Sequence, residues 1–537
     1  MSEREPSQGD GRATPAETKT TDLPETEGAG RSAEAAAGAF RHYSGKVSRQ
    51  GFIFLGGTLF SVACGYVFKI YVSRTIGADG LGLYALGMRV VDLCAMLANL
   101  GLSMSLARHV ALYSSTDQKG RIRSLLLAAL AFSVGAAVAL GALVALARDW
   151  LATTVFNEPA LVAYLPIVAL LIPVATANEL LGQYLRGHQE VSRRTLINHF
   201  LQFPVKIAVT VGLFALGLGV TGYLVGELVS QAAAVLLLAF FAVRFTPTAD
   251  PDAAPGLDRK VRTFASSMIG LNALGFVSSK ADVVILGILL DAEQVGIYSI
   301  AVTTGAFVPT LLRALNSIFG PIISGLHARG DRELLERLFQ TSTKWCLGLT
   351  FPLVAVICCF AAELMGIFGP DFRAGGLALA LVAVGQLINV GTGSVGNLLT
   401  MSGHQNWELK TLGVTAVLTL GLDVLLIPVW GLEGAALALA LALSVANLIR
   451  LYLVRRHLGL RAYRRRALWL AVPMTVSAVV VVAVRQLWPG GPDLVALFVA
   501  LAAAYLAFLA AAYPVLDDDD RMLLRAAIEK VRSRLGR

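Results

Sequence analysis

The sequence predicts an all-α, polytopic membrane protein of about 14 transmembrane helices, built as two parallel six-helix repeats followed by two additional C-terminal helices. Three observations support this fold class. Of the 537 residues, 56% are hydrophobic and only 15% are charged, a composition far from that of a soluble domain. Long apolar stretches recur along the chain, and several loops of the first half return in the second half.

The apolar stretches set the number and position of the expected helices. A helix needs roughly 20 apolar residues to cross the hydrocarbon core of a bilayer. Stretches of about this length or longer occur at 51–73, 83–106, 124–147, 160–183, 194–216, 221–243, 263–289, 297–322, 339–361, 375–400, 409–429, 433–455, 466–487 and 493–514. These fourteen spans define the predicted membrane region.

Three loops reveal an internal duplication. They recur in order, with offsets of 214, 216 and 212 residues: Ala78–Tyr84 returns as Ala292–Tyr298, Gly187–Gln189 as Gly403–Gln405, and Gly219–Gly222 as Gly431–Gly434. Three matches in register indicate that the first six helices and the next six share an origin. Internally duplicated helical membrane proteins are most often transporters.

The distribution of basic residues predicts the orientation. The loops on one side of the membrane carry most of the arginine and lysine, for example Arg121, Arg194, Arg262, Arg332 and Arg465. The loops on the other side offer only a few, such as Arg74, Arg148 and Arg373. An excess of basic residues marks the cytoplasmic side, so we expect a multi-pass protein of the cytoplasmic (inner) membrane with both termini in the cytoplasm. Six helices per repeat is an even number, which makes the repeats parallel.

The same patterns divide the chain into six segments. The first is polar and lacks an apolar core, which is typical of disorder, and the last is a basic amphipathic helix expected on the membrane surface. In chain order they are a cytoplasmic tail (1–47), the first six-helix lobe (48–245), a cytoplasmic linker (246–261), the second lobe (262–457), two additional transmembrane helices (458–514) and the amphipathic helix (515–537).

Two segments resemble a known family. Residues 425–436, LLIPVWGLEGAA, are similar to the L-L-I-P-x-x-G-x-x-G-A-A element of polysaccharide-export flippases, and residues 76–84, IGADGLGLY, resemble the loop after their first helix. These are the Wzx-type flippases of the multidrug/oligosaccharidyl-lipid/polysaccharide (MOP) exporter superfamily. The resemblance covers roughly residues 48–487. It implies two lobes facing each other across a central cavity, and a polyprenyl-diphosphate-linked oligosaccharide as substrate.

Cations inside the predicted spans are the candidate substrate-binding residues. A charge in hydrocarbon is costly, so such residues usually face a cavity or a partner. Lys69 and Arg89 fall in the first two helices, and Lys280 and Arg313 in the equivalent helices of the second lobe. Together they could bind a diphosphate, chiefly through Lys280 and Arg313, which lie deepest. Two structural readings stay open: Arg89 can pair with Asp92 on its own helix, and Lys69 can extend to the headgroups.

Carboxylates in the spans are the candidates for ion coupling. Asp92, Glu179 and Asp282 could bind a coupling proton or sodium ion, as could Glu227 and Asp423. The alternative, which we favour, is that each partners a nearby cation. The seven histidines lack metal-ligand spacing, so no metal site, no cofactor and no catalytic residue is expected.

Together with these residues, the resemblance implies a flippase that moves a polyprenyl-diphosphate-linked oligosaccharide across the membrane by alternating access, for polysaccharide export. The expected partners are the membrane, the glycan lipid, a polysaccharide polymerase and glycosyltransferases, and no nucleic acid. An enzyme finds little support, since no phosphate loop or nucleophile elbow occurs. The alternatives are a multidrug or metabolite cation antiporter of the same fold and a peptidoglycan-precursor flippase.

Overall fold

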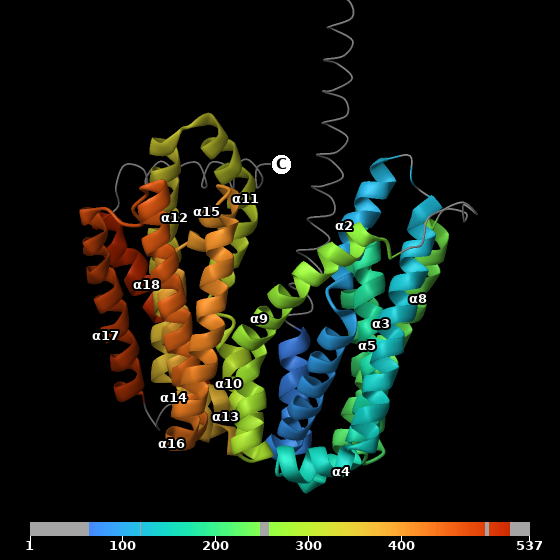
Figure 1. The fold of residues 1–537 in the computed structure, drawn as a ribbon. Helices are drawn as coiled ribbons and strands as arrows, with labels where there is room; N and C mark the ends of the chain where they lie inside the picture. The colour runs from blue at the N-terminus through green and yellow to red at the C-terminus, as the bar shows by residue number, and fades with distance from the viewer. Residues whose placement is uncertain (1–63, 117, 119, 247–256, 489–492, 516–537) are drawn as a thin grey trace, which may run out of the picture. The chain divides into compact units, whose positions relative to one another are not determined.

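The computed structural model confirms the all-α fold. It describes residues 64–116, 118, 120–246, 257–488 and 493–515 (Figure 1), and these contain helices and connections but no strands. All of them belong to a single unit, residues 57–537. The predicted tail 1–47, most of the predicted linker 246–261 and all but the first residue of the predicted basic helix 515–537 lie outside the described residues.

The first half of the described chain is a bundle in which helices close in sequence pack together. It comprises Cys64–Asn99, α2 (Leu102–Ser115), α3 (Gly120–Leu146), α5 (Leu165–Gly187), a span Ser192–Ala215 that ends in α7 (Phe203–Ala215), and α8 (Gly219–Phe245). Helix α5 packs against α2, α3 and α8, and α7 packs against α8 (Figure 1). The short helix α4 (Arg148–Trp150) and two further turns connect α3 to α5.

The second half begins with α9 and follows the same plan. It comprises α9 (Arg259–Leu289), α10 (Ala292–Gly305), α11 (Thr310–Arg329), α12 (Arg332–Cys359), α13 (Ala361–Gly366), α14 (Gly376–Thr392), α15 (Val395–Met401) and α16 (Gln405–Leu453). Asp258, Asp291 and Asp331 begin α9, α10 and α12 as N-caps, each accepting a hydrogen bond from the backbone N–H three residues on. Such caps satisfy donors that a helix start leaves unpaired.

Helix α9, the first helix of the second half, also contacts the first half. Near its N-terminus, the hydroxyl of Ser105 on α2 donates to the carbonyl of Val261 over 3.2 Å, and Val261 and Ala265 belong to the apolar core of the first half. Helix α9 also packs against α16 of the second half. The helix therefore links the two repeats.

Two helices are longer than one bilayer crossing requires. Cys64–Asn99 has 36 residues and α16 has 49, and at about 1.5 Å per residue both exceed the roughly 30 Å hydrocarbon core. Each contains a glycine with positive φ beside a repeated loop: 72° at Gly77 and 56° at Gly431. Glycine tolerates this conformation because it has no Cβ. Cys64–Asn99 can therefore divide at Gly77, and α16 at Gly431, each into two of the predicted spans.

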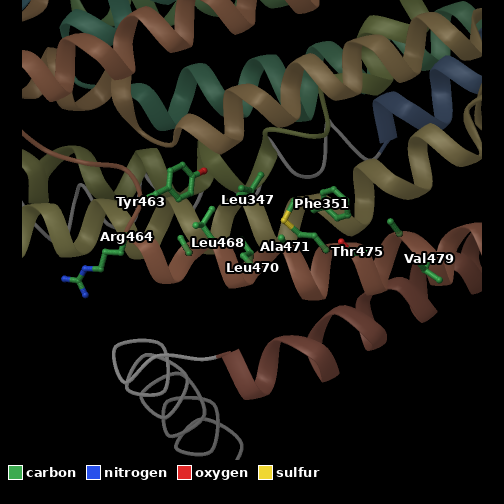
Figure 2. Close-up of a pocket in the computed structure, with 12 residues that line it drawn as sticks. Leu347, Phe351, Tyr463, Arg464, Leu468, Leu470, Ala471, Thr475 and Val479 are labelled. Atoms are coloured by element: carbon green, nitrogen blue, oxygen red, sulfur yellow. The ribbon is translucent and has the colours of Figure 1, made fainter.

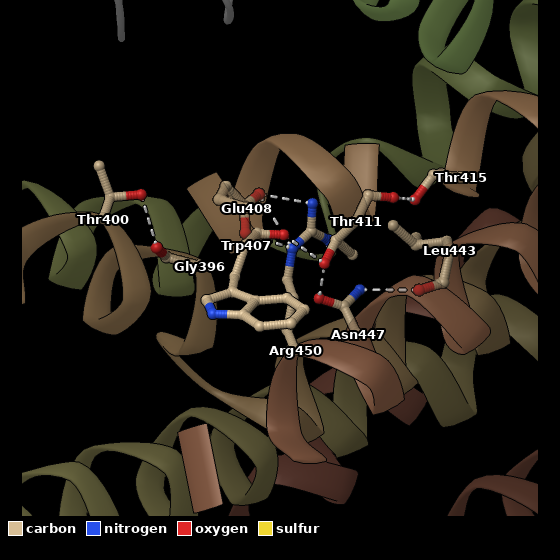
Figure 3. Close-up of polar contacts among 9 residues, drawn as sticks. All are labelled: Gly396, Thr400, Trp407, Glu408, Thr411, Thr415, Leu443, Asn447 and Arg450. Carbon is tan, nitrogen blue, oxygen red and sulfur yellow. Dashed lines mark hydrogen bonds and ion pairs between the residues drawn. The ribbon is translucent and has the colours of Figure 1, made fainter. Parts of the chain in front are cut away.

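An ion pair shows that α16 folds back on itself (Figure 3). Arg450, near its C-terminal end, donates from Nε to both carboxylate oxygens of Glu408 over 3.0 and 2.9 Å and from Nη2 over 2.7 Å. A straight helix would hold these two residues far apart. The pair therefore joins the ends of a hairpin whose bend is at Gly431.

The number of candidate spans among the described residues is close to the predicted fourteen. The described residues contain 11 helices long and apolar enough to cross a membrane, or up to 12 if the bent pair Ala292–Gly305 and Thr310–Asn316 forms one span. The predicted count of fourteen further requires that both long helices be two spans. It stays a prediction.

The two additional helices pack on the second half. Helices α17 (Ala471–Leu487) and α18 (Leu494–Ala512) contact each other and α12 (Figure 1). The hydroxyl of Ser477 donates to the carbonyl of Ala504, and that of Tyr505 donates to Leu349 of α12 over 2.9 Å. The final pair of helices therefore adds to the second lobe from outside the duplication.

Candidate substrate and ion site

Two of the predicted cations meet at one carboxylate. Asp92 Oδ2 accepts from Arg89 Nη1 and from Lys280 Nζ, both at 2.8 Å. Arg89 and Asp92 lie three residues apart on one helix and pair with each other, one of the alternatives left open by the sequence. Lys280 comes from α9 of the other half. The side chains are partly exposed, 27% for Asp92 and 38% for Lys280. This arrangement leaves one positive charge in excess.

Lys69 lies near the same group. Its ammonium donates to the hydroxyl of Thr303 on α10 over 2.7 Å and is close enough to Arg89 to interact with it electrostatically. The hydrogen bond to Thr303 shows that Lys69 is turned towards the other half. We refer to Lys69, Arg89 and Lys280, with Asp92, as the basic cluster.

Arg313 makes a different contact. It is exposed and donates from Nη2 to the carbonyl of Ala306, in the break where α10 and α11 meet at 51°. The last carbonyls of a helix lack intrahelical partners, and a cation there also complements the helix dipole. Arg313 therefore supports the bend, while the other three predicted cations gather at the basic cluster.

Two of the three predicted ion-coupling carboxylates have cationic partners. Asp92 is shared by Arg89 and Lys280, and Glu179 accepts from Arg194 over 3.1 Å and from Gln183 over 2.8 Å. Both contacts agree with the reading that these acids neutralise nearby cations. The third, Asp282, has a different environment.

Asp282 and Asp423 form a buried acidic pair. Asp282, on α9, is 5% exposed and accepts from the Tyr298 hydroxyl over 2.6 Å and from the Val283 backbone N–H. Asp423, on α16, is fully buried, and neither of its carboxylate oxygens has a hydrogen-bond partner among the described residues. The two carboxylates lie close enough to interact electrostatically, as do Asp282 and Arg89. The acidic pair therefore adjoins the basic cluster.

The equivalent tyrosine of the first half has a complete ion pair beside it. Tyr84, which corresponds to Tyr298 in the repeat, donates to Glu227 over 3.2 Å. Glu227 is also 2.5 Å from Lys206 Nζ, and Gln231 donates to its other oxygen. Each repeated tyrosine thus contacts a buried carboxylate, but only Glu227 has a lysine directly bonded to it.

A separate apolar pocket lies beside the additional helices (Figure 2). Its volume is about 530 Å³, and α12 and α17 provide most of its lining, including Leu347, Phe351 and Met474. Tyr463 and Arg464 lie towards one end of it (Figure 2). The pocket can accommodate hydrocarbon, and none of the predicted site residues lines it.

Sequence reasoning missed the neutral members of the site. Thr303 and Tyr298 hold Lys69 and Asp282 in place, yet neither carries a charge that would single it out in an apolar span. Tyr298 had one usable signal, because it closes a repeated loop and is matched by Tyr84. Thr303 had none.

Comparison with known proteins identifies the family of the chain. The family described as "Polysaccharide biosynthesis protein" matches residues 71–371, more than half of the chain. A curated Haloferax volcanii protein, "Probable low-salt glycan biosynthesis flippase Agl15", is 25% identical over 228 residues. That segment covers 42% of this chain and 48% of the relative, so the match spans about half of the length of the curated relative.

Solved structures show the same fold. A lipid II flippase MurJ in an inward closed conformation aligns with a TM-score of 0.69 at 12% identity, over 86% of this chain and 98% of MurJ. An inward-facing multidrug resistance MATE transporter of the MOP superfamily aligns with a TM-score of 0.58 at 16% identity, over 76% of this chain and 98% of its own. At these identities the likeness concerns the fold alone. The chain therefore belongs to the polysaccharide biosynthesis protein family and has the fold of MOP superfamily transporters.

Proposed function

We propose that this protein is a flippase that carries a polyprenyl-diphosphate-linked oligosaccharide from the inner to the outer leaflet of the cytoplasmic membrane. The basic cluster is the observation that carries the proposal: Arg89 and Lys280 meet at Asp92 between the two halves, and Lys69 lies near Arg89. An excess of positive charge in a membrane interior is costly, and a diphosphate would neutralise it. Membership of a polysaccharide biosynthesis family supports a glycan lipid as the source of that diphosphate.

The chemistry of the cluster suits a diphosphate headgroup. Arg89 Nε is buried and has no hydrogen-bond partner among the described residues, so one donor of this guanidinium group is unused. Guanidinium groups bind phosphate through paired hydrogen bonds, and lysine acts as a compact charge. The apolar pocket near α17 is consistent with a substrate that also carries a long hydrocarbon chain.

The orientation follows from the basic loops. With the arginine-rich loops in the cytoplasm, both termini are cytoplasmic, and the loops at Gly77 and Gly431 face outward. Glycosyltransferases would then supply the glycan lipid on the inner side, and a polymerase would receive it on the outer side. The chain itself performs no chemical step in this scheme.

We further propose that the acidic pair binds the coupling ion, a proton or a sodium ion. An ionised carboxylate without a partner is expensive in a buried site, so Asp423 is expected to hold either a proton or a cation. Its closeness to Asp282, which also interacts with Arg89, connects the ion to the basic cluster. Binding of the ion would reduce the local negative charge and so alter the attraction between the two halves.

Replacing Asp423 with asparagine is expected to uncouple transport from the ion gradient. The amide cannot ionise, so exchange should persist while uphill accumulation driven by a proton or sodium gradient is lost. The measurement is glycan-lipid movement in vesicles with and without each gradient. Glu179→Gln, which alters a carboxylate already paired with Arg194, is the matched control. An Asp423→Asn protein that responds to the gradient like wild type would contradict this role.

The two alternatives make different predictions. A multidrug or metabolite cation antiporter would require a predominantly acidic cavity, whereas the basic cluster and the adjoining acidic pair together hold three cations and three carboxylates. A peptidoglycan-precursor flippase would also bind a lipid-linked diphosphate, and the likeness in fold to the lipid II flippase MurJ is compatible with this alternative. The two kinds of flippase therefore differ in the glycan that they transport, and identifying this glycan distinguishes them.

Deleting the gene tests the function in cells. The expected result is loss of a surface polysaccharide, with its lipid-linked precursor accumulating on the inner leaflet and peptidoglycan synthesis continuing. Leaflet-specific labelling of the precursor with a membrane-impermeant lectin measures this directly. Arrest of peptidoglycan synthesis would favour the precursor flippase, and drug sensitivity with normal glycan would favour the antiporter.

A further inference from the structure

A small pocket lies where α11 ends, α12 begins and the chain leaves α16. Its volume is about 230 Å³, and no member of the basic cluster or of the acidic pair lines it. Glycines with positive φ end the elements on two sides: Gly330, at 72°, follows α11, and Gly459, at 64°, follows the turn Val454–Leu458. In the proposed orientation, with the arginine-rich loops in the cytoplasm, this α11–α12 pocket lies at the inner surface of the membrane.

Three basic side chains from three elements line the α11–α12 pocket. They are His327 at the end of α11, Arg332 at the start of α12 and His457 in the turn after α16, and all three are exposed. The fold therefore brings together, at one place on the surface, basic groups from three separate elements.

Packing fixes the position of two of these side chains. A Cβ atom on Gly459 would overlap the guanidinium group of Arg332, so the glycine allows this group to lie against the backbone of the turn. The ring of His457 packs on Trp407, with centroids 5.0 Å apart, and on His404, at 5.5 Å. Groups held in place in this way lose little further freedom when a ligand binds.

The side chains of the α11–α12 pocket favour an anion. Among the residues that the structure describes, no ion pair neutralises His327, Arg332 or His457. Asp331 also lines the pocket, but its Oδ1 accepts from the backbone N–H of Leu334 as the N-cap of α12. The N-terminal end of α12 favours an anion and the C-terminal end of α11 opposes one, so the two helix ends offset each other. The basic side chains therefore decide what the pocket binds.

The floor of the pocket is apolar. Leu326, Leu335, Leu458 and Leu460 line it and belong to one buried core cluster. The pocket thus combines basic groups with an apolar surface, as a ligand with a phosphate and a hydrocarbon part requires.

We propose that the α11–α12 pocket binds a phosphate group, and that an anionic phospholipid of the inner leaflet supplies it. Arg332 binds the phosphate oxygens through paired hydrogen bonds, and the imidazole N–H groups of His327 and His457 donate further ones. The apolar floor favours a lipid headgroup over a soluble phosphate, because the glycerol and the first methylene groups of the acyl chains cover the leucines. The bound lipid joins α11, α12 and the turn after α16, and no residue proposed to bind the transported diphosphate takes part.

Protection of the two histidines measures binding at this pocket alone. Full-length protein in detergent micelles reacts with diethyl pyrocarbonate, and mass spectrometry of its peptides gives the modification rates of His327 and His457. Phosphatidylglycerol is the probe. It is expected to slow both reactions by about tenfold at ten times its dissociation constant.

Arg332→Gln removes the charged donor and should weaken the protection. The lipid concentration for half-protection is expected to rise by about tenfold or more. Arg329→Gln is the matched control, because Arg329 is exposed and adjoins Gly330 but does not line the pocket. Should Arg332→Gln not fold, His327→Gln decides, with a rise of about threefold or more in the concentration that protects His457.

Two further probes identify the part of the lipid that is bound. Diacylglycerol, which lacks the phosphate, is expected to give no protection, and glycerol phosphate, which lacks the acyl chains, to protect only at much higher concentration. Equal protection by diacylglycerol, or equal shifts in Arg332→Gln and Arg329→Gln, would overturn the phosphate site. Equal protection by glycerol phosphate would overturn the lipid as its source. None of these readouts involves transport, so their failure leaves the proposed function standing.

Discussion

Replacing Glu227 with alanine is expected to cause the largest loss of stability among single substitutions in the first half. Its carboxylate lies 2.5 Å from Lys206 Nζ, with side-chain exposures of 10% and 15%. Removing one partner of a buried ion pair leaves the other charge uncompensated and costs about 3–5 kcal/mol. Tyr84 and Gln231 would also lose their acceptor. The measurement is the thermal unfolding midpoint of purified protein in detergent.

A compensating variant provides the control. Replacing both members, as Lys206→Met with Glu227→Leu, removes the charges together and should recover much of the lost stability. An unfolding midpoint of Glu227→Ala equal to that of wild type would show that the pair contributes little. A double variant as unstable as the single one would show that the hydrogen bonds of Glu227, rather than its charge, account for the loss.

Removing one cation from the basic cluster is expected to have the largest effect on transport. Lys280→Met should reduce glycan-lipid movement by about ten- to a hundredfold, since a hydrogen bond to a charged group is worth about 1.5–3 kcal/mol. Arg89→Met should act similarly. Each variant leaves Asp92 with one cation, so abundance in the membrane should be retained. Initial transport rates and membrane abundance are measured together.

A basic residue elsewhere on the same helix serves as the control. Lys260 lies exposed at the start of α9, and Lys260→Met removes the same charge outside the cluster. Its transport rate should match that of wild type. Equal loss in Lys260→Met and Lys280→Met would attribute the effect to net charge, and full transport by both cluster variants would show that the diphosphate binds elsewhere.

The sequence was sufficient to predict most of the fold. Hydropathy located the helices because a bilayer requires long apolar segments, and the duplication identified the loops at which the long helices break. Gly431 is an example: its repeated loop predicted a boundary between two spans, and the contact between Arg450 and Glu408 shows the chain folding back there. The contact between the two copies of the first repeated loop, where Gly82 lies against Ala292 and Gly296 against Ala78, could not be predicted, because similarity between two segments does not imply contact.

The site was only partly predictable. Intramembrane charge singled out Lys69, Arg89 and Lys280, since charged residues are rare in hydrocarbon. The meeting of Arg89 and Lys280 at Asp92 depends on how α9 crosses to the first half, which periodicity does not encode. Similarly, Asp282 and Asp423 resembled the other intramembrane acids in sequence. Only the arrangement of α9 and α16 shows that, among the described residues, no cation is directly bonded to this pair, whereas Glu227 has one.

Transport by the purified protein tests the central proposal most directly. The protein is reconstituted in vesicles with a polyprenyl-diphosphate-linked oligosaccharide, and an impermeant lectin measures the fraction of glycan exposed on the outer leaflet with time. We predict movement that depends on the protein and falls in Lys280→Met vesicles but not in Lys260→Met vesicles. Exposure at the rate of protein-free vesicles, with properly folded protein present, would contradict the proposal that this chain is a glycan-lipid flippase.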